Sequence, residues 1–153
     1  MASFVNATDA IAAAMEIERR GYAFYTRVQE KAENPKEKEF FTFMANEEKR
    51  HHDLFMDMLE RIGGLRLPVQ STDQEYLDYL TAMLDYHSLF EPSLEQRSIT
   101  SPLHAAMQLE KDTLLYFIEM EDLVPDSEKH HVRALADEER RHLKLLSKIR
   151  NLP

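Results

Sequence analysis

The sequence contains no cysteine or tryptophan, and only 3 glycines and 6 prolines among its 153 residues. The absence of cysteine excludes disulfides, thiolate metal sites and an iron–sulfur module within this chain. With few glycines and prolines, little interrupts long helices, and Ala, Leu, Met, Glu, Lys and Arg favour helix over sheet. The length suits one domain with a substantial core, which we expect to span residues 1–153.

Basic residues are also scarce, with 19 Lys and Arg against 28 Asp and Glu and a net charge of −9. This balance argues against a nucleic-acid or anionic-membrane partner, because phosphate groups bind to a basic face. No apolar run approaches the ~18 residues that span a bilayer. Residues 1–6 show neither the basic nor the apolar part of a secretory signal. We therefore expect a cytoplasmic protein, which the lack of cysteine also fits.

Helix start and stop signals divide the chain into long helical segments. Asn34 and Ser101 each precede a proline, the pattern of an N-cap followed by proline at the first helical position. Gly63 and Gly64 form a helix stop. Four long helices are expected at about 7–33, 36–62, 102–123 and 126–149.

Connection lengths predict how these helices are arranged. The first two and the last two are joined by a few residues, so each pair forms an antiparallel hairpin. The second and third are separated by about forty residues, enough to return along a helix of ~39 Å. A capping box at Thr72 and Glu75 starts a shorter helix at about 73–89 within this connection. The expected fold is all-α, a ferritin-like antiparallel four-helix bundle with one long crossover.

The pattern Glu-x-x-His occurs twice, once in the second long helix and once in the fourth, and each copy has a lone glutamate about thirty residues upstream. The six residues are Glu18, Glu48, His51, Glu110, Glu139 and His142. Corresponding residues of the two halves are 91 or 92 positions apart, which suggests a pseudo-twofold axis. Four carboxylates and two imidazoles from two half-chains are the ligand set of a dinuclear metal centre inside a four-helix bundle.

The phase of these residues distinguishes them from the other acids. Glu48 and His51 continue an apolar stripe that includes Phe41, Met44 and Phe55, and the other three helices repeat this placement. One Glu-x-x-His in a charged helix is usually a solvated face or an i,i+3 pair. Two in-phase copies, each with an in-phase upstream glutamate, favour metal binding. Four buried carboxylates would cost several kcal/mol each without compensation, and two divalent cations balance their charge.

Tyr25 and Gly21 lie on the same face of the first helix as Glu18. Tyr25 is either a core aromatic or a catalytic phenol that hydrogen-bonds to a ligand or donates an electron or a proton. The missing side chain of Gly21 either leaves space for an oxygen ligand or permits close helix packing.

Other polar residues are expected to have no part in the site. Glu47 falls outside the apolar stripe, and the charged run from Glu138 to Arg141 is interpreted as a solvated face. The remaining histidines lack a matched carboxylate, and we expect surface or interfacial positions for them. They are His52, His87, His104, His130 and His131.

Over nearly its whole length, the chain resembles the rubrerythrin-type diiron branch of the ferritin-like superfamily. The matching motifs, in order, are Glu18 followed by Tyr25, then Glu48-Lys49-Arg50-His51, Glu110, and Glu139-Arg140-Arg141-His142. The resemblance implies that Glu48 and Glu139 bridge two metals, that Glu18 and Glu110 are terminal carboxylates, and that His51 and His142 each bind one metal. The implied cofactor is two iron ions, although manganese or a mixed pair suits the same ligands.

The chain departs from the family pattern at two points. Full-length rubrerythrins carry a rubredoxin-like domain with a four-cysteine iron, which this cysteine-free chain lacks, so we expect a separate electron donor. Rubrerythrins also carry an extra carboxylate one turn after the glutamate of the third helix, where this chain has Thr113. Its absence implies that both histidines stay bound in both redox states.

The resemblance implies a diiron oxidoreductase, an enzyme that reacts with hydrogen peroxide or dioxygen and assembles as a homo-oligomer, expected to be a dimer. Two alternatives remain open. One is an iron-handling protein that oxidises Fe(II) for transfer or storage. The other is a metal-stabilised interaction module without redox activity. The enzyme and the iron handler differ in whether iron stays in place during turnover.

Overall fold

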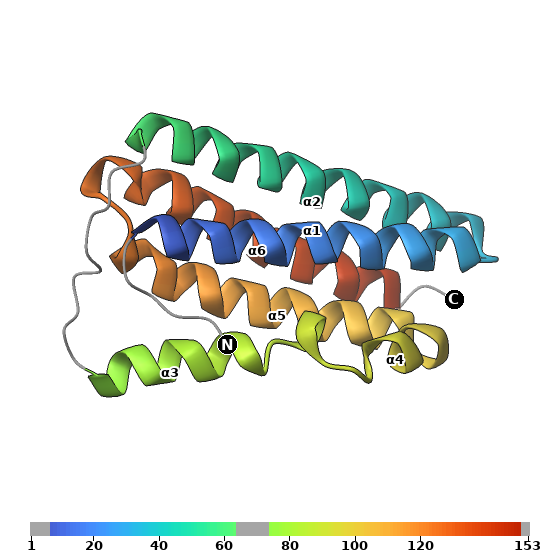
Figure 1. Ribbon diagram of the computed structural model, residues 1–153. Helices are drawn as coiled ribbons and strands as arrows, with labels where there is room; N and C mark the ends of the chain where they lie inside the picture. The colour runs from blue at the N-terminus through green and yellow to red at the C-terminus, as the bar shows by residue number, and fades with distance from the viewer. Residues whose placement is uncertain (1–6, 64–73, 151–153) are drawn as a thin grey trace.

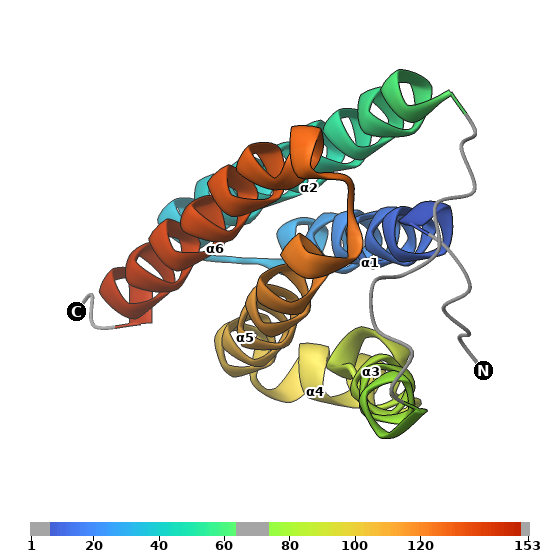
Figure 2. The same cartoon turned by 90° about the vertical axis from the view of Figure 1, so that its left-hand side faces the viewer.

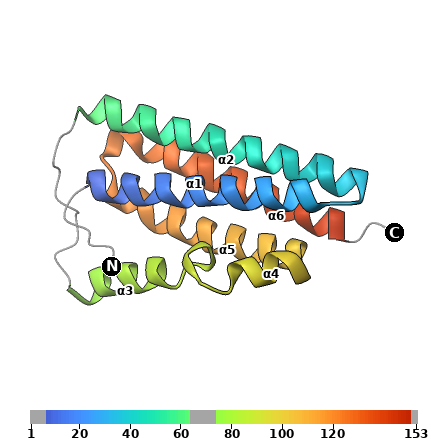
Figure 3. The ribbon, with the colours of Figure 1, turned by 45° about the vertical axis from the view of Figure 1, so that its right-hand side comes forward.

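The computed structural model describes residues 7–63 and 74–150, which form a bundle of α-helices (Figure 1). Its four long helices are α1 (Ala7–Lys31), α2 (Pro35–Ile62), α5 (Pro102–Met120) and α6 (Lys129–Arg150). They pack as two hairpins, α1 with α2 and α5 with α6, as predicted (Figures 1 and 3). None of the described helices is both long and apolar enough to cross a membrane.

The hairpin between α1 and α2 follows from the chemistry of its turn. The side chain of Asn34 accepts hydrogen bonds from the backbone N–H groups of Lys36 at 2.8 Å and Glu37 at 3.3 Å. Pro35 occupies the first turn of α2, where its missing N–H leaves no unmet donor. At the other end, Gly63 takes the left-handed conformation with φ 61°, which ends the helix. Both signals were predicted from the sequence.

The crossover between α2 and α5 differs in detail from its prediction. It contains α3 (Gln74–Asp85), the short 3₁₀ turn η1 (Ser88–Phe90) and α4 (Leu94–Thr100) in place of one helix at 73–89. Pro92 follows Glu91, whose extended backbone at ψ 135° cannot continue a helix, so the chain restarts as α4. The predicted capping residue Thr72 and the second stop glycine, Gly64, lie outside the described residues.

The crossover elements cover one side of the bundle. Figure 2 shows α3 and α4 on the side away from α2 and α6, and η1 and α4 contact both α1 and α5. The chain therefore returns along the length of the bundle, which makes the fold the predicted ferritin-like arrangement. The predicted helices at 102–123 and 126–149 each include a short 3₁₀ turn, η2 (Glu121–Leu123) and η3 (Asp126–Glu128).

An ion pair between an exposed arginine and a buried carboxylate fixes the end of α2 to the start of the last helical segment. Arg61 donates to Glu128 from Nε at 2.9 Å and from Nη2 at 2.8 Å, a two-point contact between a half-exposed guanidinium and a carboxylate that is 3% exposed. Such bidentate pairs are stronger than single hydrogen bonds between neutral groups. The contact holds the two hairpins together at the end of the bundle where the crossover begins.

Replacing this arginine tests the contribution of the pair. The substitution Arg61→Met keeps most of the aliphatic stem but leaves the Glu128 carboxylate buried without its partner. We expect the free energy of unfolding to fall by about 1–2 kcal/mol. Arg19→Met is the matched control, because Arg19 pairs with Glu16 along one exposed helix face, and it should cost less than about 0.5 kcal/mol. Urea titrations of both variants would measure the difference, and equal midpoints would contradict the assigned role.

Candidate metal centre

The four long helices direct six polar side chains into the middle of the bundle, and each is at most 3% exposed. They are Glu18 from α1, Glu48 and His51 from α2, Glu110 from α5, and Glu139 and His142 from α6. These are the residues that interrupt the apolar stripes of the sequence. Because each stripe faces the core, helical phase alone brings the six together.

Five of the six form two groups of three that share Glu139. In the first group, Nδ1 of His51 lies 3.2 Å from Oε1 of Glu139 and 3.5 Å from Oε1 of Glu18. In the second, Nδ1 of His142 lies 3.6 Å from Oε2 of Glu139 and 3.9 Å from Oε2 of Glu110. Within each group the ligand atoms lie within 4.8 Å of one another. Each group uses a different oxygen of Glu139, an arrangement that suits a carboxylate between two cations.

Glu48 is buried beside these groups without being part of either. It lies against Gly21, where an added Cβ would be 2.8 Å from Oε2 of Glu48 and 2.9 Å from its Cδ. Burial raises the pKa of Glu48 well above its usual value, and the nearby Glu18 and Glu110 add to the effect. The missing side chain of Gly21 therefore gives the carboxylate of Glu48 room to lie against α1.

Within the described part of the chain, the site holds several buried polar atoms that have no hydrogen-bond partner. They are both carboxylate oxygens of Glu18 and of Glu139, Oε2 of Glu110, and Nδ1 of His51 and of His142. A buried polar atom without a partner costs on the order of 1–3 kcal/mol, and such atoms are rare in folded proteins. Here they gather at one place and are oxygen and imidazole nitrogen donors, the set that iron and manganese accept. The residues present therefore fit a pair of metal ions.

The pKa values of the site residues reflect the same demand for positive charge. Burial raises the pKa of Glu110 to about 8, and Glu139 adds to the shift. Burial alone would lower the pKa of His51, but Glu138, Glu139 and Glu18 outweigh it and raise the value to about 12. For His142, Glu110 and Glu139 likewise outweigh burial and raise the pKa to about 10. Without metal, protons supply the positive charge that the carboxylates require.

The outer nitrogens of the two histidines face carboxylates that lie outside the predicted ligand set. Nε2 of His51 lies 2.5 Å from Oε2 of Glu138, and Nε2 of His142 lies 3.7 Å from Oε2 of Glu47. Each carboxylate faces the histidine of the other half-chain. A carboxylate on the far nitrogen fixes the orientation of an imidazole and leaves the near nitrogen free for a metal. The interpretation of Glu138 as part of a solvated face is therefore wrong.

The position of Glu47 and Glu138 in the sequence held a signal for this role. Each immediately precedes a glutamate of a Glu-x-x-His pattern, so both copies read Glu-Glu-x-x-His. One step along a helix turns a side chain by ~100°, which moves it from the core stripe to the seam between neighbouring helices. Glu47, His51 and Glu138 would also suit a cation, but Arg50 already provides one, with Nη2 2.6 Å from Glu47 and 2.5 Å from Glu138.

Tyr25 is fully buried, and its hydroxyl donates to Oε1 of Glu110 at 2.7 Å. Burial raises the pKa of Tyr25 well above 10, so the phenol keeps its proton. The ring stacks on Phe41 with 6.2 Å between centroids. The bond occupies one oxygen of Glu110 and leaves the other, Oε2, without a partner.

One histidine lies in an unexpected environment. His87 was predicted at the surface or an interface, but it is 2% exposed, so that prediction is wrong. Its Nε2 lies 3.0 Å from the hydroxyl of Thr113. No periodic apolar pattern surrounds His87 in the sequence, because the crossover turns sharply at this point. The other four histidines outside the site, His52, His104, His130 and His131, are partly or fully exposed, as expected.

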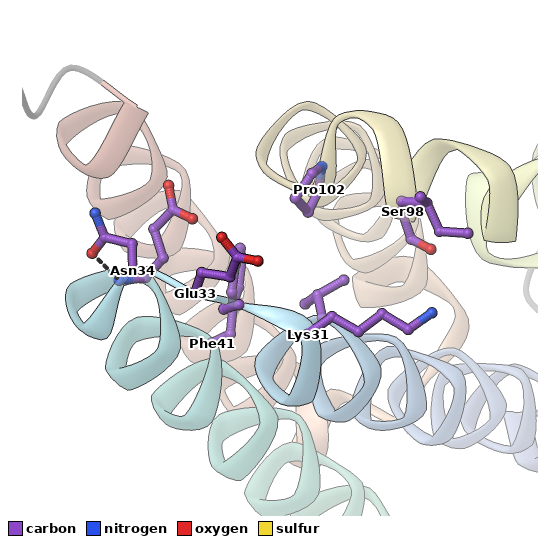
Figure 4. A pocket seen from close by; sticks show the side chains of 10 residues that line it. Lys31, Glu33, Asn34, Phe41, Ser98 and Pro102 are labelled. Atoms are coloured by element: carbon purple, nitrogen blue, oxygen red, sulfur yellow. Dashed lines mark hydrogen bonds between the residues drawn. The ribbon is translucent and has the colours of Figure 1, made fainter.

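A pocket of about 420 Å³ lies at the surface between α1 and α2 and has one residue of the site in its lining. It is lined by Glu18, Arg19, Tyr22, Lys49, His52 and Asp53. A second pocket, of about 310 Å³, lies where the α1–α2 turn meets α4 and α5 (Figure 4). Phe41 lines the second pocket, which contains none of the six residues of the site. Only the first of these two pockets therefore reaches a predicted ligand.

The protein is a bundle of four long helices with a candidate dimetal carboxylate site. The site consists of two carboxylate–histidine groups that share one glutamate. The family model for rubrerythrin matches residues 9–150, and the chain belongs to this family. A crystal structure of a Thermotoga maritima protein, described as ferritin-like and diiron-carboxylate, superposes with a TM-score of 0.64 and 20% identity over 97% of both chains. That likeness supports the shared fold alone. A comparison with curated protein sequences gave no significant match.

Because Gly21 lies close to Glu48, adding a side chain at position 21 should weaken metal binding without loss of helix. Gly21→Ala adds a methyl group that must displace the Glu48 carboxylate, while alanine favours helix by about 1 kcal/mol relative to glycine. We expect a loss of metal affinity of about tenfold or more, with helix content unchanged. The exposed substitution Ala12→Gly is the control for helix propensity and should leave affinity unchanged. Calorimetric titration with Mn²⁺ measures both, and unaltered affinity in Gly21→Ala would show that Glu48 takes no part in binding.

The raised pKa values predict how metal-free stability depends on pH. Glu110 at about 8 and His142 at about 10 lie above their ordinary values of 4.5 and 6.5, so the folded state keeps protons that the unfolded state releases. Their contribution to stability is complete when the pH is below those ordinary pKa values, and it is lost as the pH rises through the pKa values of the folded state. The pKa values of Glu138 and Glu139 are lowered, so the stability that these residues contribute is lost only in more acidic solution. They therefore do not oppose this trend above pH 5.

We therefore expect the unfolding midpoint of the metal-free protein to fall by about 5 °C between pH 5 and pH 9. The increase in midpoint on adding Mn²⁺ should grow over the same range, because metal binding displaces the protons on the histidines. Calorimetry with and without a chelator measures both quantities. The double variant His51→Gln/His142→Gln should lose much of the slope, and a metal-free midpoint that rises with pH would contradict the assignment.

Proposed function

We propose that the protein is a diiron oxidoreductase that reduces hydrogen peroxide or dioxygen at the centre of the bundle. The observation that carries the proposal is the set of seven unpartnered ligand atoms, which lie in two groups that share Glu139. A purely structural polar cluster would pair these atoms with one another or with backbone groups. These enclosed oxygen and nitrogen atoms become available as ligands when the histidine protons leave, and as a set they suit a reactive metal pair.

The residues divide between the two ions as follows. Glu18 and His51 would hold one ion, Glu110 and His142 the other, and Glu139 would bridge them through its two oxygens. Glu48 would supply the second bridge, as the family resemblance implies. When bound in the ferrous state, two irons would supply two electrons, enough to cleave the O–O bond of hydrogen peroxide or to reduce dioxygen to peroxide.

The remaining residues orient ligands, move protons and exclude water. Glu138 fixes the imidazole of His51 by its bond to Nε2, so that Nδ1 points inward. The hydroxyl of Tyr25 donates a hydrogen bond to one oxygen of Glu110, and the raised pKa of Tyr25 keeps this phenol protonated under all ordinary conditions. The fully buried rings of Phe41, Phe55 and Phe117 belong to the apolar core of the bundle, from which bulk water is excluded. This enclosure protects a reactive centre from side reactions.

The pocket between α1 and α2 is the proposed route for the oxidant. Arg19, Lys49 and His52 line it together with Asp53, and the buried Glu18 also contributes to its lining. Basic groups at the mouth favour a small neutral or anionic molecule over a free cation. The electrons for repeated turnover must come from outside these residues, because the chain has no cysteine and thus no iron–sulfur relay of its own.

Anaerobic loading with Fe(II), followed by stopped-flow mixing, tests the proposal. Peroxide should oxidise the centre faster than dioxygen does, and the two irons should remain bound over repeated cycles of oxidation and added reductant. Glu139→Gln should lower two-ion affinity by more than about a hundredfold, because a shared ligand serves both ions. The exposed Glu30→Gln is its control.

Three results are distinguishable in this experiment. Retained iron with rapid peroxide reduction supports the oxidoreductase. Iron that leaves or accumulates beyond two per chain after oxidation indicates iron handling instead. An oxidation rate no greater than that of free Fe(II), with either oxidant, leaves only a metal-stabilised interaction module.

A further inference from the structure

A buried hydrogen bond joins the crossover to the helix that carries Glu110. Nε2 of His87 lies 3.0 Å from Oγ1 of Thr113, and both residues are 2% exposed. His87 precedes η1 in the crossover, whereas Thr113 lies in α5, one turn beyond Glu110. The pair takes no part in the metal-ligand set described above, so its burial needs a separate explanation.

The surroundings of His87 fix which of its nitrogens carries the proton. The backbone N–H of Leu89 donates to Nδ1 at 3.1 Å, so Nδ1 is an unprotonated acceptor. Burial lowers the pKa of His87 to about 4, against the opposing effects of Asp112 and Glu139, so the ring is neutral. A neutral imidazole with an acceptor at Nδ1 has its proton on Nε2. His87 therefore donates to the oxygen of Thr113.

This direction leaves the hydroxyl proton of Thr113 available. Other helical threonines use theirs locally: Thr42 donates to the carbonyl of Lys38 at 2.8 Å, and Thr100 to that of Gln96 at 3.2 Å. In the described part of the chain, Thr113 makes no such bond to the carbonyl four residues before it. Its oxygen already accepts from His87, so its proton is free to donate to another acceptor.

The location of Thr113 indicates where that acceptor lies. Thr113 shares the buried face of α5 with Glu110 and Phe117 and lies one helical turn from Glu110, a residue of the candidate metal centre. Glu139, the glutamate shared by both ligand groups, is near enough to His87 to influence its titration. The free donor is thus at the edge of a site whose other buried groups are mostly acceptors.

We propose that Thr113 donates a hydrogen bond to a small anionic or oxygen ligand bound at the metal pair, and that His87 is the positioning residue that orients its hydroxyl. This inference rests on the metal pair of the proposed function. A fixed donor beside the position where negative charge collects stabilises that charge without reorganisation. The neutral His87 acts through the direction of its N–H and not as a store of protons.

Four substitutions distinguish the role of the Thr113 hydroxyl, the proposed donor, from that of His87, which orients it. Thr113→Val removes the hydroxyl at nearly constant volume, and Thr113→Ser keeps it. His87→Asn keeps a side-chain acceptor for the N–H of Leu89 but has no donor at the position of Nε2. His87→Gln places an amide nitrogen near that position and restores the donor. Thr42→Val, on the exposed face of α2, is the control for loss of a threonine hydroxyl.

Azide is the probe, titrated into the iron-loaded, oxidised protein and followed by its charge-transfer absorbance. Thr113→Val and His87→Asn should each weaken azide binding by about tenfold, the effect of one hydrogen bond to a charged ligand. Thr113→Ser, His87→Gln and Thr42→Val should bind azide nearly as the parent does. The double variant Thr113→Val/His87→Asn should be no weaker than Thr113→Val alone, because His87 acts through Thr113.

A measurement on the metal-free protein tests the orientation independently. The ¹⁵N shifts of the His87 ring should show a proton on Nε2, none on Nδ1, and no titration between pH 5 and pH 8. A proton on Nδ1 would overturn the proposal, as would equal azide affinity in the parent and Thr113→Val or no azide binding by the iron-loaded parent. Failure of the parent to take up two irons would instead overturn the proposed function, and this inference with it.

Discussion

Repulsion among four carboxylates enclosed at one point is the constraint on which the rest of this structure depends. Glu18, Glu48, Glu110 and Glu139 lie where water cannot screen them. The bundle can close around them only if positive charge enters with them, either as protons on the histidines and on Glu110 or as metal ions. The same residues therefore control how the protein folds and what it binds, and a change in one alters the other.

A surrounding layer of residues holds this charged centre in place. Tyr25 reaches Glu110 from α1, Arg50 lies between Glu47 and Glu138, and the crossover covers the remaining side with the buried His87. Most of these contacts run between helices, so the packing of the bundle and the orientation of its ligands support each other. A rigid frame of this kind suits a site whose ligand atoms must stay close together although few hydrogen bonds join them to one another.

Much of the fold was predictable because its signals are local. Caps such as Asn34 and Gly63 act within one turn, and the apolar stripes report which face of each helix is buried. Periodicity describes a helix about its own axis and says nothing of its neighbours. The roles of Glu138 and His87 were missed for that reason, since one depends on the seam between α2 and α6 and the other on how the crossover bends before Pro92.

The two halves repeat in sequence but have not remained equal in space. Glu138 lies 2.5 Å from the outer nitrogen of His51, whereas Glu47 lies 3.7 Å from that of His142. Arg50 contacts both carboxylates, but its counterpart Arg141 stays 3.9 Å from Glu138. A site made from two identical copies of one hairpin would be forced into symmetry. Joining the copies in a single chain removes that requirement, so each of the two ligand groups can acquire its own affinity for a cation.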